Sequence, residues 1–191
     1  VLGSLRSLVA AHRSVTPGSP VLVVMGPAGS GKSTLGIALA TELDLPFLEG
    51  DALHSPESIA RMTAGQPLTD ADRLPWLGRI RSWIVARVAA GEGGVVACSA
   101  LKRTYREVLV RGHEDTVRLV DLEASRALLA SRLASRAGHF FGPSLLDSQL
   151  ATLEPPDDDE RPIRVRAEWP VPRAVAEIVR TLGLEPPAAN G

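Results

Sequence analysis

Residues 26–33 read GPAGSGKS, the spacing G-x-x-x-x-G-K-[ST], and no other segment of the chain constrains the fold as strongly. The apolar, largely β-branched run at 21–25 predicts a strand buried on both faces, and leucines at four-residue spacing predict a helix over 32–44. In such a unit, glycines let successive backbone N–H groups point at phosphate oxygens, and the helix start adds unpaired N–H groups. The segment therefore predicts a site for the phosphates of a nucleoside triphosphate.

The residue types of this loop predict how phosphates and a metal ion are bound. Lys32 offers a point charge to the β and γ phosphates, and the hydroxyl of Ser33 is a ligand for Mg²⁺. The residues expected to bind the nucleotide are Gly26, Ala28, Gly29, Ser30, Gly31, Lys32, Ser33 and Thr34. ATP and Mg²⁺ are therefore the expected cofactors.

Four further short apolar runs alternate with helical patterns along the chain. The runs lie at 46–48, 94–98, 117–122 and 163–165. The further helical patterns lie at 56–64, 73–90, 101–111, 124–137, 143–153 and 172–182. This alternation predicts an α/β fold with three layers, in which a five-stranded parallel sheet carries helices on both faces. We expect one folded domain at 20–184, an N-terminal extension at 1–19 and a flexible tail at 185–191.

The charge and the apolar content of the sequence limit which classes of partner the protein can bind. The 191 residues carry a formal net charge of −1, so no overall basic field favours nucleic acid. No apolar stretch reaches the roughly 18 residues needed to cross a bilayer. The single cysteine, Cys98, lies in an apolar run and is typical of a reduced, buried thiol in a cytoplasmic protein. We therefore expect a cytoplasmic protein with a small-molecule substrate and neither a nucleic-acid nor a membrane partner.

Two carboxylates follow the second predicted strand. In an open parallel sheet ligands bind at the carboxyl ends of the strands, and Glu49 and Asp51 stand there two residues apart. In extended chain they would point the same way. One would then serve the metal, and the other would accept the proton of a substrate hydroxyl. The residues alone leave open the alternative that Asp51 only caps the next turn.

A hydroxyl and a basic group follow the third predicted strand, at Ser99, Lys102 and Arg103. This combination suits an anionic or hydroxyl-rich small molecule. Basic side chains in the first turn of a helix oppose its dipole, which favours a bound ligand over a solvated helix start. Residues 61–79 contribute Arg61 and Arg73 to a possible flap over this molecule, and Asp70 or Asp72 is expected to cap the helix at 73–90.

Arginines follow the fourth predicted strand, where P-loop enzymes place a lid. Arg132 and Arg136 lie four residues apart on one helical face, with His139 beyond them. Such a face would close over the triphosphate and neutralise charge that develops during transfer, with Gly138 as a hinge. The alternative is a solvated arginine face, but the position after the fourth strand favours a lid at about 124–142.

Several sequence blocks in order show a family resemblance. They are GPAGSGKST at 26–34, EGDALH at 49–54, ARMTAGQPLTDADRLPWL at 60–77, VVACSALKRTYR at 95–106, and SRAGHFFGPSLLDSQLATLEPPDDDE at 135–160. Over residues 20–183 the chain resembles the gluconate kinases, small P-loop enzymes related to shikimate kinase and the nucleoside monophosphate kinases. The first block is widespread, whereas PLTDADRLPWL and CSALKRTYR are specific and carry the resemblance.

The resemblance implies a three-layer P-loop NTPase fold with a helical lid, and a homodimer. It also implies transfer of the γ-phosphoryl group of ATP to the 6-hydroxyl of D-gluconate, with Asp51 as the base and Lys32, Arg132 and Arg136 as stabilising charges. The residues it offers to gluconate are Asp51, His54, Arg61, Arg73, Ser99, Lys102, Arg103 and His139. The family usually has Asp where this chain has Glu49, so contact between Glu49 and the metal could run through water.

Three other functions stay open on the sequence. One is a kinase for another small hydroxy acid such as shikimate, and another is a nucleoside monophosphate kinase, which the blocks at 60–77 and 95–106 disfavour. The third is a nucleotide-binding regulator without phosphoryl transfer. A nucleic-acid role is the weakest, because the basic residues sit at strand ends and not along one exposed face.

Overall fold

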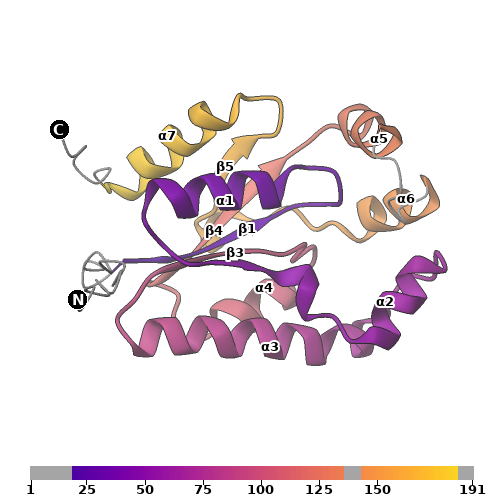
Figure 1. Cartoon of the computed structure of the whole chain (residues 1–191), viewed down its shortest axis with the longest axis horizontal. Coiled ribbons are helices and arrows are strands. Elements are labelled where there is room, and N and C mark those ends of the chain that lie inside the picture. The colour runs from indigo at the N-terminus through magenta and orange to yellow at the C-terminus, as the bar shows by residue number, and fades with distance from the viewer. Residues whose placement is uncertain (1–18, 136–142, 185–191) are drawn as a thin grey trace, which may run out of the picture.

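The computed structural model describes residues 19–135 and 143–184, which form one parallel sheet with helices on both faces (Figure 1). The strands are β1 (Val21–Met25), β2 (Phe47–Glu49), β3 (Gly94–Ala97), β4 (Val117–Glu123) and β5 (Ile163–Arg166). They pair in parallel in the order β2-β3-β1-β4-β5, so β1 is central. The predicted five-stranded parallel sheet is confirmed.

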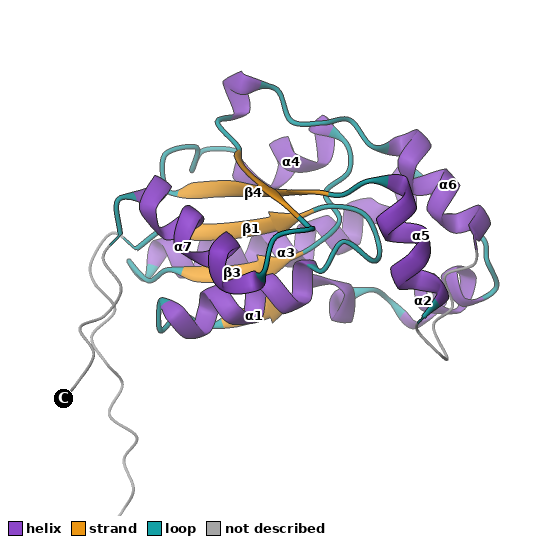
Figure 2. Cartoon of the chain, turned by 90° about the horizontal axis from the view of Figure 1, so that it is seen from above, coloured by secondary structure: helices purple, strands orange, loops and turns teal. Residues whose placement is uncertain are grey.

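Seven helices surround this sheet in the described part of the chain. They are α1 (Lys32–Glu42), α2 (Pro56–Thr63), α3 (Asp70–Ala89), α4 (Arg103–Val110), α5 (Arg126–Ala134), α6 (Pro143–Thr152) and α7 (Val171–Leu182). Helices α1 and α7 cover one face and α3 and α4 the other (Figure 1), whereas α5 and α6 lie together beyond the carboxyl ends of the strands (Figure 2). The three-layer prediction is therefore confirmed. None of the described helices is long and apolar enough to cross a membrane.

The side chains of β1 alternate between two apolar layers. Leu22 and Val24 join the layer that contains residues of α1 and α7, whereas Val21, Val23 and Met25 join the layer with α3 and α4. All five side chains are fully buried. A strand that is covered on both faces needs an unbroken apolar run, which is why residues 21–25 carry no polar side chain.

Sheet register aligns the three strand ends that matter for a site. Ala97 of β3 is opposite Val24 of β1 and also opposite Glu49 of β2. Gly26, Ser99 and Asp51 each come two residues after this row, so three segments distant in sequence emerge from the sheet at the same level. Because of this alignment, side chains that follow the three strands can contribute to one ligand site.

The start of α3 differs from the sequence expectation. The helix begins at Asp70, and its cap is Thr69, whose Oγ1 accepts the Asp72 backbone N–H at 3.3 Å. The Asp72 carboxylate in turn accepts the Thr69 backbone N–H at 2.8 Å, which completes a capping box. The prediction that Asp70 or Asp72 caps a helix at 73 was therefore wrong, although Asp72 is the reciprocal partner.

One carboxyl group is buried in the sheet itself. Asp121 of β4 is 7% exposed. Burial, together with the nearby Glu123 carboxylate, raises the pKa of Asp121 to about 6, while the guanidinium groups of Arg106 and Arg164 act in the opposite direction. The folded state therefore holds this proton more tightly than the unfolded chain does.

We expect Asp121→Asn to flatten the pH dependence of stability. Because the folded pKa exceeds the unfolded one, the contribution of the neutral acid is fully present below about pH 4 and is lost as pH rises through about 6. Between about pH 4 and pH 8 the wild-type free energy of unfolding should fall by about 2 to 3 kcal/mol relative to the variant. Urea unfolding at several pH values measures this. The exposed Asp115→Asn is the matched control, and parallel profiles for Asp121→Asn and wild type would contradict the prediction.

Candidate active site

The loop at 26–31 joins β1 to α1 and curls around its own backbone. Gly31, the residue before α1, has φ +102°, a left-handed conformation that favours glycine. The Gly26 backbone N–H donates to the carbonyl of Ser99 at 3.3 Å, which ties the loop to the end of β3. Lys32 is 8% exposed, and its ammonium group donates to the Pro27 carbonyl at 3.4 Å, so its charge lies inside the curve of the loop.

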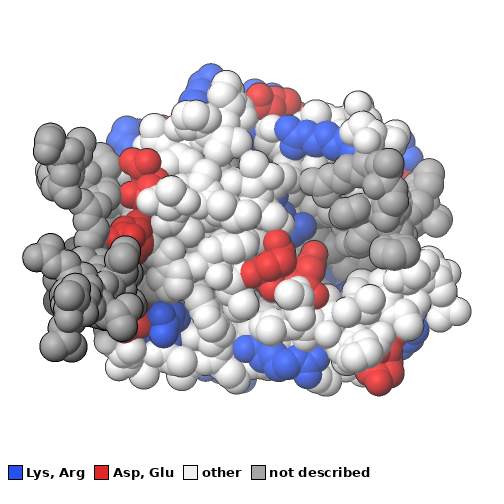
Figure 3. All heavy atoms as spheres, viewed as in Figure 1, with Lys and Arg blue, Asp and Glu red and all other residues white. Residues whose placement is uncertain are grey.

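A cavity of about 370 Å³ opens between this loop and the ends of β2 and β3. It is lined by Ala28, Gly29, Lys32, Ser33, Glu49, Asp51, His54, Ile59, Met62, Leu68, Arg73, Trp76, Ser99, Leu133 and Gln149. On the face shown in Figure 3, acidic side chains gather at the rim of a hollow beside the strand ends. The structure therefore places Lys32, Ser33, Glu49, Asp51, His54, Arg73 and Ser99, all expected from the sequence, around one space.

The two carboxylates reach the cavity by a different local geometry from the expected one. Glu49 ends β2, but Asp51 lies in a single 3-10 turn, Gly50–Leu53, so the pair does not share extended chain. A Cβ on Gly50 would lie 2.5 Å from the Ala97 carbonyl oxygen, so only glycine lets this turn pack so closely on β3. The Gly50 carbonyl accepts the indole N–H of Trp76 at 2.7 Å. The tight packing and this hydrogen bond fix the turn that carries Asp51.

His54 forms one wall of the cavity. Its ring stacks on Trp76 with 4.4 Å between centroids and 10° between planes. Burial lowers the pKa of His54, although the Asp51 carboxylate opposes the shift. Nδ1 is buried and has no hydrogen-bond partner among the described residues. The neutral ring is therefore placed to exchange a hydrogen bond with a polar ligand.

The cavity also offers oxygen ligands that fit a divalent cation. Oε1 of Glu49 is buried and has no hydrogen-bond partner among the described residues, and the Ser33 hydroxyl lines the same space. A carboxylate and a hydroxyl beside a phosphate loop suit Mg²⁺, which is usually held by one or two protein oxygens, phosphates and water. Glu49 and Ser33 are thus the residues that fit the metal.

Three predicted substrate residues do not line the cavity. Arg61 forms an ion pair with Asp72 at 2.8 Å, and Lys102 forms one with Asp70 at 2.7 Å. Arg103, the first residue of α4, forms an ion pair with Asp159 at 2.5 Å. Carboxylates of the chain already bind these three charges, and a contact with gluconate stays a prediction for them.

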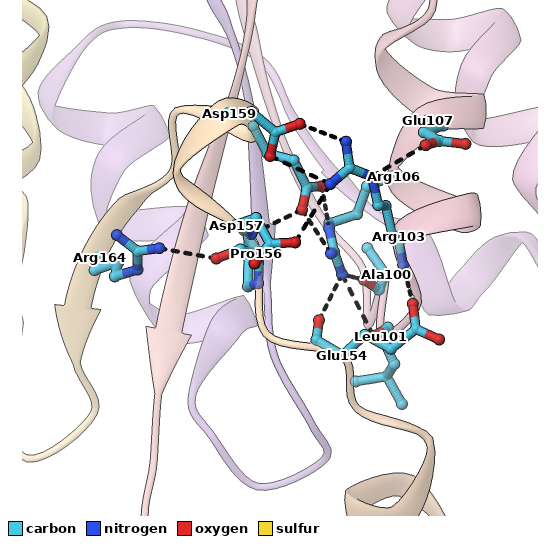
Figure 4. Close-up of polar contacts among 11 residues, drawn as sticks. Ala100, Leu101, Arg103, Arg106, Glu107, Glu154, Pro156, Asp157, Asp159 and Arg164 are labelled. Atoms are coloured by element: carbon cyan, nitrogen blue, oxygen red, sulfur yellow. Dashed lines mark hydrogen bonds and ion pairs between the residues drawn. The ribbon is translucent and has the colours of Figure 1, made fainter.

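The acidic segment at 154–160 explains the basic start of α4 (Figure 4). A Glu154 carboxylate oxygen accepts the Arg103 backbone N–H at 2.7 Å, and the Glu154 carbonyl accepts from Arg106 at 2.8 Å. Arg106 also forms a bidentate pair with Glu160, at 2.6 and 2.8 Å, and donates to the Ala100 carbonyl at 3.3 Å. An acidic loop of the chain therefore offsets the unfavourable interaction of the basic side chains with the helix dipole, so the basic first turn no longer favours a bound ligand over a solvated helix start.

Arg132 lies on the opposite side of the phosphate loop. Its guanidinium donates to the carbonyls of Ser30 and Ala167, both at 2.7 Å. It helps line a groove of about 180 Å³ between the loop and the start of α7, together with Trp169 and Arg166. Gly29, Ser30, Gly31 and Thr34 border this groove. Arg136, His139 and the end of the predicted lid lie outside the described residues.

Gln149 was not expected as a site residue. It comes from α6, lines the cavity, and its Oε1 accepts the Ala28 backbone N–H at 2.7 Å. The residue is uncharged and belongs to no recognised spacing, so only its place inside the block at 135–160 could have suggested it. Trp76, which supports both His54 and Gly50, was expected from the sequence only as part of a flap at 61–79.

The central strand, the glycine-rich loop and the helix that follows define a P-loop nucleotide-binding protein. In agreement, residues 21–156 match the family model described as AAA domain.

Similar proteins identify the family of P-loop proteins to which this chain belongs. The gluconokinase of Gluconobacter oxydans (strain 621H) is 52% identical over 159 residues, which cover 83% of this chain and 89% of that protein. A solved sugar kinase from Janibacter sp. HTCC2649 is 43% identical and superposes with a TM-score of 0.82, covering 91% of this chain and 99% of that one. A gluconokinase from Sinorhizobium meliloti 1021 is 44% identical with a TM-score of 0.77, covering 90% and 94%. The chain belongs to the gluconokinase family of P-loop kinases.

The buried pair of Arg106 and Glu160 yields a stability prediction. The side chains are 1% and 9% exposed, and burial alone would raise the pKa of Glu160, but the Arg106 guanidinium and the Asp157 backbone N–H outweigh it and lower that pKa. Glu160→Gln leaves a buried guanidinium without its counter-charge, which should cost on the order of 3 kcal/mol of unfolding free energy at neutral pH. Chemical denaturation measures the loss.

The matched control is Asp159→Asn, which removes an exposed carboxylate of the same loop. Its ion pair with Arg103 is solvated, so the variant should unfold almost as wild type does. Equal denaturation midpoints for Glu160→Gln and Asp159→Asn would show that the buried pair is not the stronger constraint.

Proposed function

We propose that this chain transfers the γ-phosphoryl group of ATP to the 6-hydroxyl of D-gluconate, which gives 6-phosphogluconate and ADP. The observation that carries the proposal is the cavity on one side of the phosphate loop, where Asp51, His54 and Arg73 meet Lys32. It offers a carboxylate for a hydroxyl proton and a cation for an acid within one space. The family relationship supports the same reaction.

The donor nucleotide is assigned to the loop and the groove behind it. The phosphates would take the backbone N–H groups of the loop, with Lys32 beside the β and γ groups. The base and ribose would enter the groove lined by Arg132, Arg166 and Trp169, because an aromatic ring and guanidinium planes stack well on a base.

The acceptor is assigned to the cavity. Gluconate is a monoanion with several hydroxyls, and Arg73 provides a planar fork for its carboxylate. Arg73 lines the cavity and is held by a hydrogen bond to the Tyr105 hydroxyl at 3.3 Å. His54 and Ser99 line the same space and offer hydrogen-bonding groups to the hydroxyls. Asp51 would accept the proton of the 6-hydroxyl as its oxygen attacks phosphorus.

Two further features of the cavity would assist the transfer: positive charge beside the phosphates, and apolar walls that exclude water. Lys32 would neutralise negative charge on the transferring group. Glu49 and Ser33 would hold Mg²⁺, which when bound would supply positive charge to offset the charge of the phosphates. Leu68, Trp76 and Leu133 give the cavity apolar walls that limit competing attack by water. By the same family resemblance we propose a homodimer that works in the cytoplasm.

A panel of acceptors tests the substrate. ADP release measured with gluconate, shikimate, other sugar acids and nucleoside monophosphates should show turnover with gluconate far above the rest, because Arg73 and the hydroxyl-binding groups suit a small sugar acid. Mass spectrometry of the product should show one added phosphoryl group. Turnover of another acceptor without turnover of gluconate would refute the assignment, and ATP binding without any turnover would favour a nucleotide-binding regulator.

The role of Asp51 is tested by Asp51→Asn. The variant keeps the shape of the turn but cannot accept the hydroxyl proton, so kcat should fall by roughly 100-fold or more while ATP affinity stays within about twofold. Steady-state kinetics and calorimetric titration of ATP provide the two measurements. The exposed Asp44→Asn serves as a control for loss of one negative charge. Full activity of the Asp51 variant would remove it from the mechanism.

A further inference from the structure

Helix α6 contacts the phosphate loop through Gln149. The Ala28 backbone N–H donates to its side-chain oxygen Oε1 at 2.7 Å. A backbone N–H can only donate, so the amide of Gln149 has a fixed orientation in which the oxygen faces the loop. The amino group must then lie on the other side of the amide, where it has no hydrogen-bond partner among the described residues.

The place of this contact along the loop is specific. Ala28 and Gln149 both line the cavity that contains Asp51 and Arg73, and neither lines the groove behind the loop. Ser30, Gly31 and Thr34 border that groove and do not line the cavity. Gln149 therefore contacts the loop on the side of the cavity to which the acceptor is assigned, and not on the side of the groove.

The chemistry of the available group suits an oxyanion. The amino group of an amide has two N–H donors and no acceptor, and it carries no charge. Lys32 and Arg73 are the cationic side chains among the described residues that line the cavity. A neutral donor in the same cavity can bind an equatorial phosphoryl oxygen in a fixed geometry without adding a further charge.

We propose that Gln149 binds the γ-phosphoryl group during transfer, with its amino group donating to a phosphoryl oxygen while its carbonyl oxygen stays on the Ala28 N–H. The proposal rests on the phosphoryl transfer proposed above, but not on the identity of the acceptor. It makes Gln149 a γ-phosphate contact that is provided by the helix and not by the loop.

Gln149→Met tests this contact, because methionine has nearly the same length and lacks both donors. We expect kcat to fall by about 100-fold, the scale of losing one preorganised donor to a developing oxyanion. The KM for gluconate should change by less than about threefold. Binding of a non-hydrolysable ATP analogue should weaken by about tenfold, whereas ADP, which has no γ-phosphate, should bind within about twofold of wild type. Gln149→Glu, which presents only oxygens to the phosphoryl group, should lose at least as much.

Asp147→Asn is the control on the same helix. Asp147 pairs with Arg126 of α5 at 2.7 Å on the exposed side, so this variant perturbs α6 without touching the cavity, and its kinetics should match wild type. Equal weakening of ADP and the ATP analogue in Gln149→Met would overturn the proposal, since a displaced loop affects both nucleotides. So would wild-type kcat with a raised KM for gluconate. The nucleotide comparison needs no acceptor, so it remains decisive even if gluconate is not the substrate.

Discussion

Parallel register across three strands is the constraint on which the candidate site depends. Val24, Ala97 and Glu49 lie on one row of the sheet, and the backbone N–H of Cys98 still donates to the Val24 carbonyl at 3.1 Å beyond it. The next bond, from Gly26 to Ser99, attaches the phosphate loop to the adjacent strand end. The phosphate loop, the Ser99 hydroxyl and the Asp51 carboxylate are thus held near one another by the sheet. The conformational entropy of bringing these three segments together is lost when the sheet folds, and not when a ligand binds.

Pairing of charges within the chain determines which cations are available to a ligand. Arg61, Lys102 and Arg103 each contact a carboxylate of the chain. Arg73, in contrast, donates to the Tyr105 hydroxyl and forms no ion pair with a described carboxylate. Its charge is therefore available to an anion in the cavity.

Local patterns predicted the sheet and much of the cavity, and tertiary contacts explain the errors. The run at 21–25 is an unbroken apolar segment because both faces of β1 are covered, and its short length, β-branched residues and following glycine identify it as a strand. Glu49 ends β2, and Asp51 and Ser99 each come two residues after a strand, so their place at one edge was predictable. The ion pair of Arg103 with Asp159 could not be predicted, because Asp159 lies far along the chain in a segment that reads only as an acidic loop. Gln149 has no local signature, since its importance comes from one long-range contact with Ala28.

The phosphate loop is contacted on both sides by the helices that follow β4. Arg132 of α5 donates to the Ser30 carbonyl on the groove side, and Gln149 of α6 accepts from the Ala28 N–H on the cavity side. Arg126 and Asp147 join these two helices to each other. A neutral hydrogen bond contributes only about 0.5 to 1.5 kcal/mol net, so the contact from α6 holds the loop in place yet can adjust when phosphate arrives. Arg132 and Gln149 therefore contact the same loop to which the phosphates are assigned, so changes to these two side chains should alter phosphate binding as well as packing.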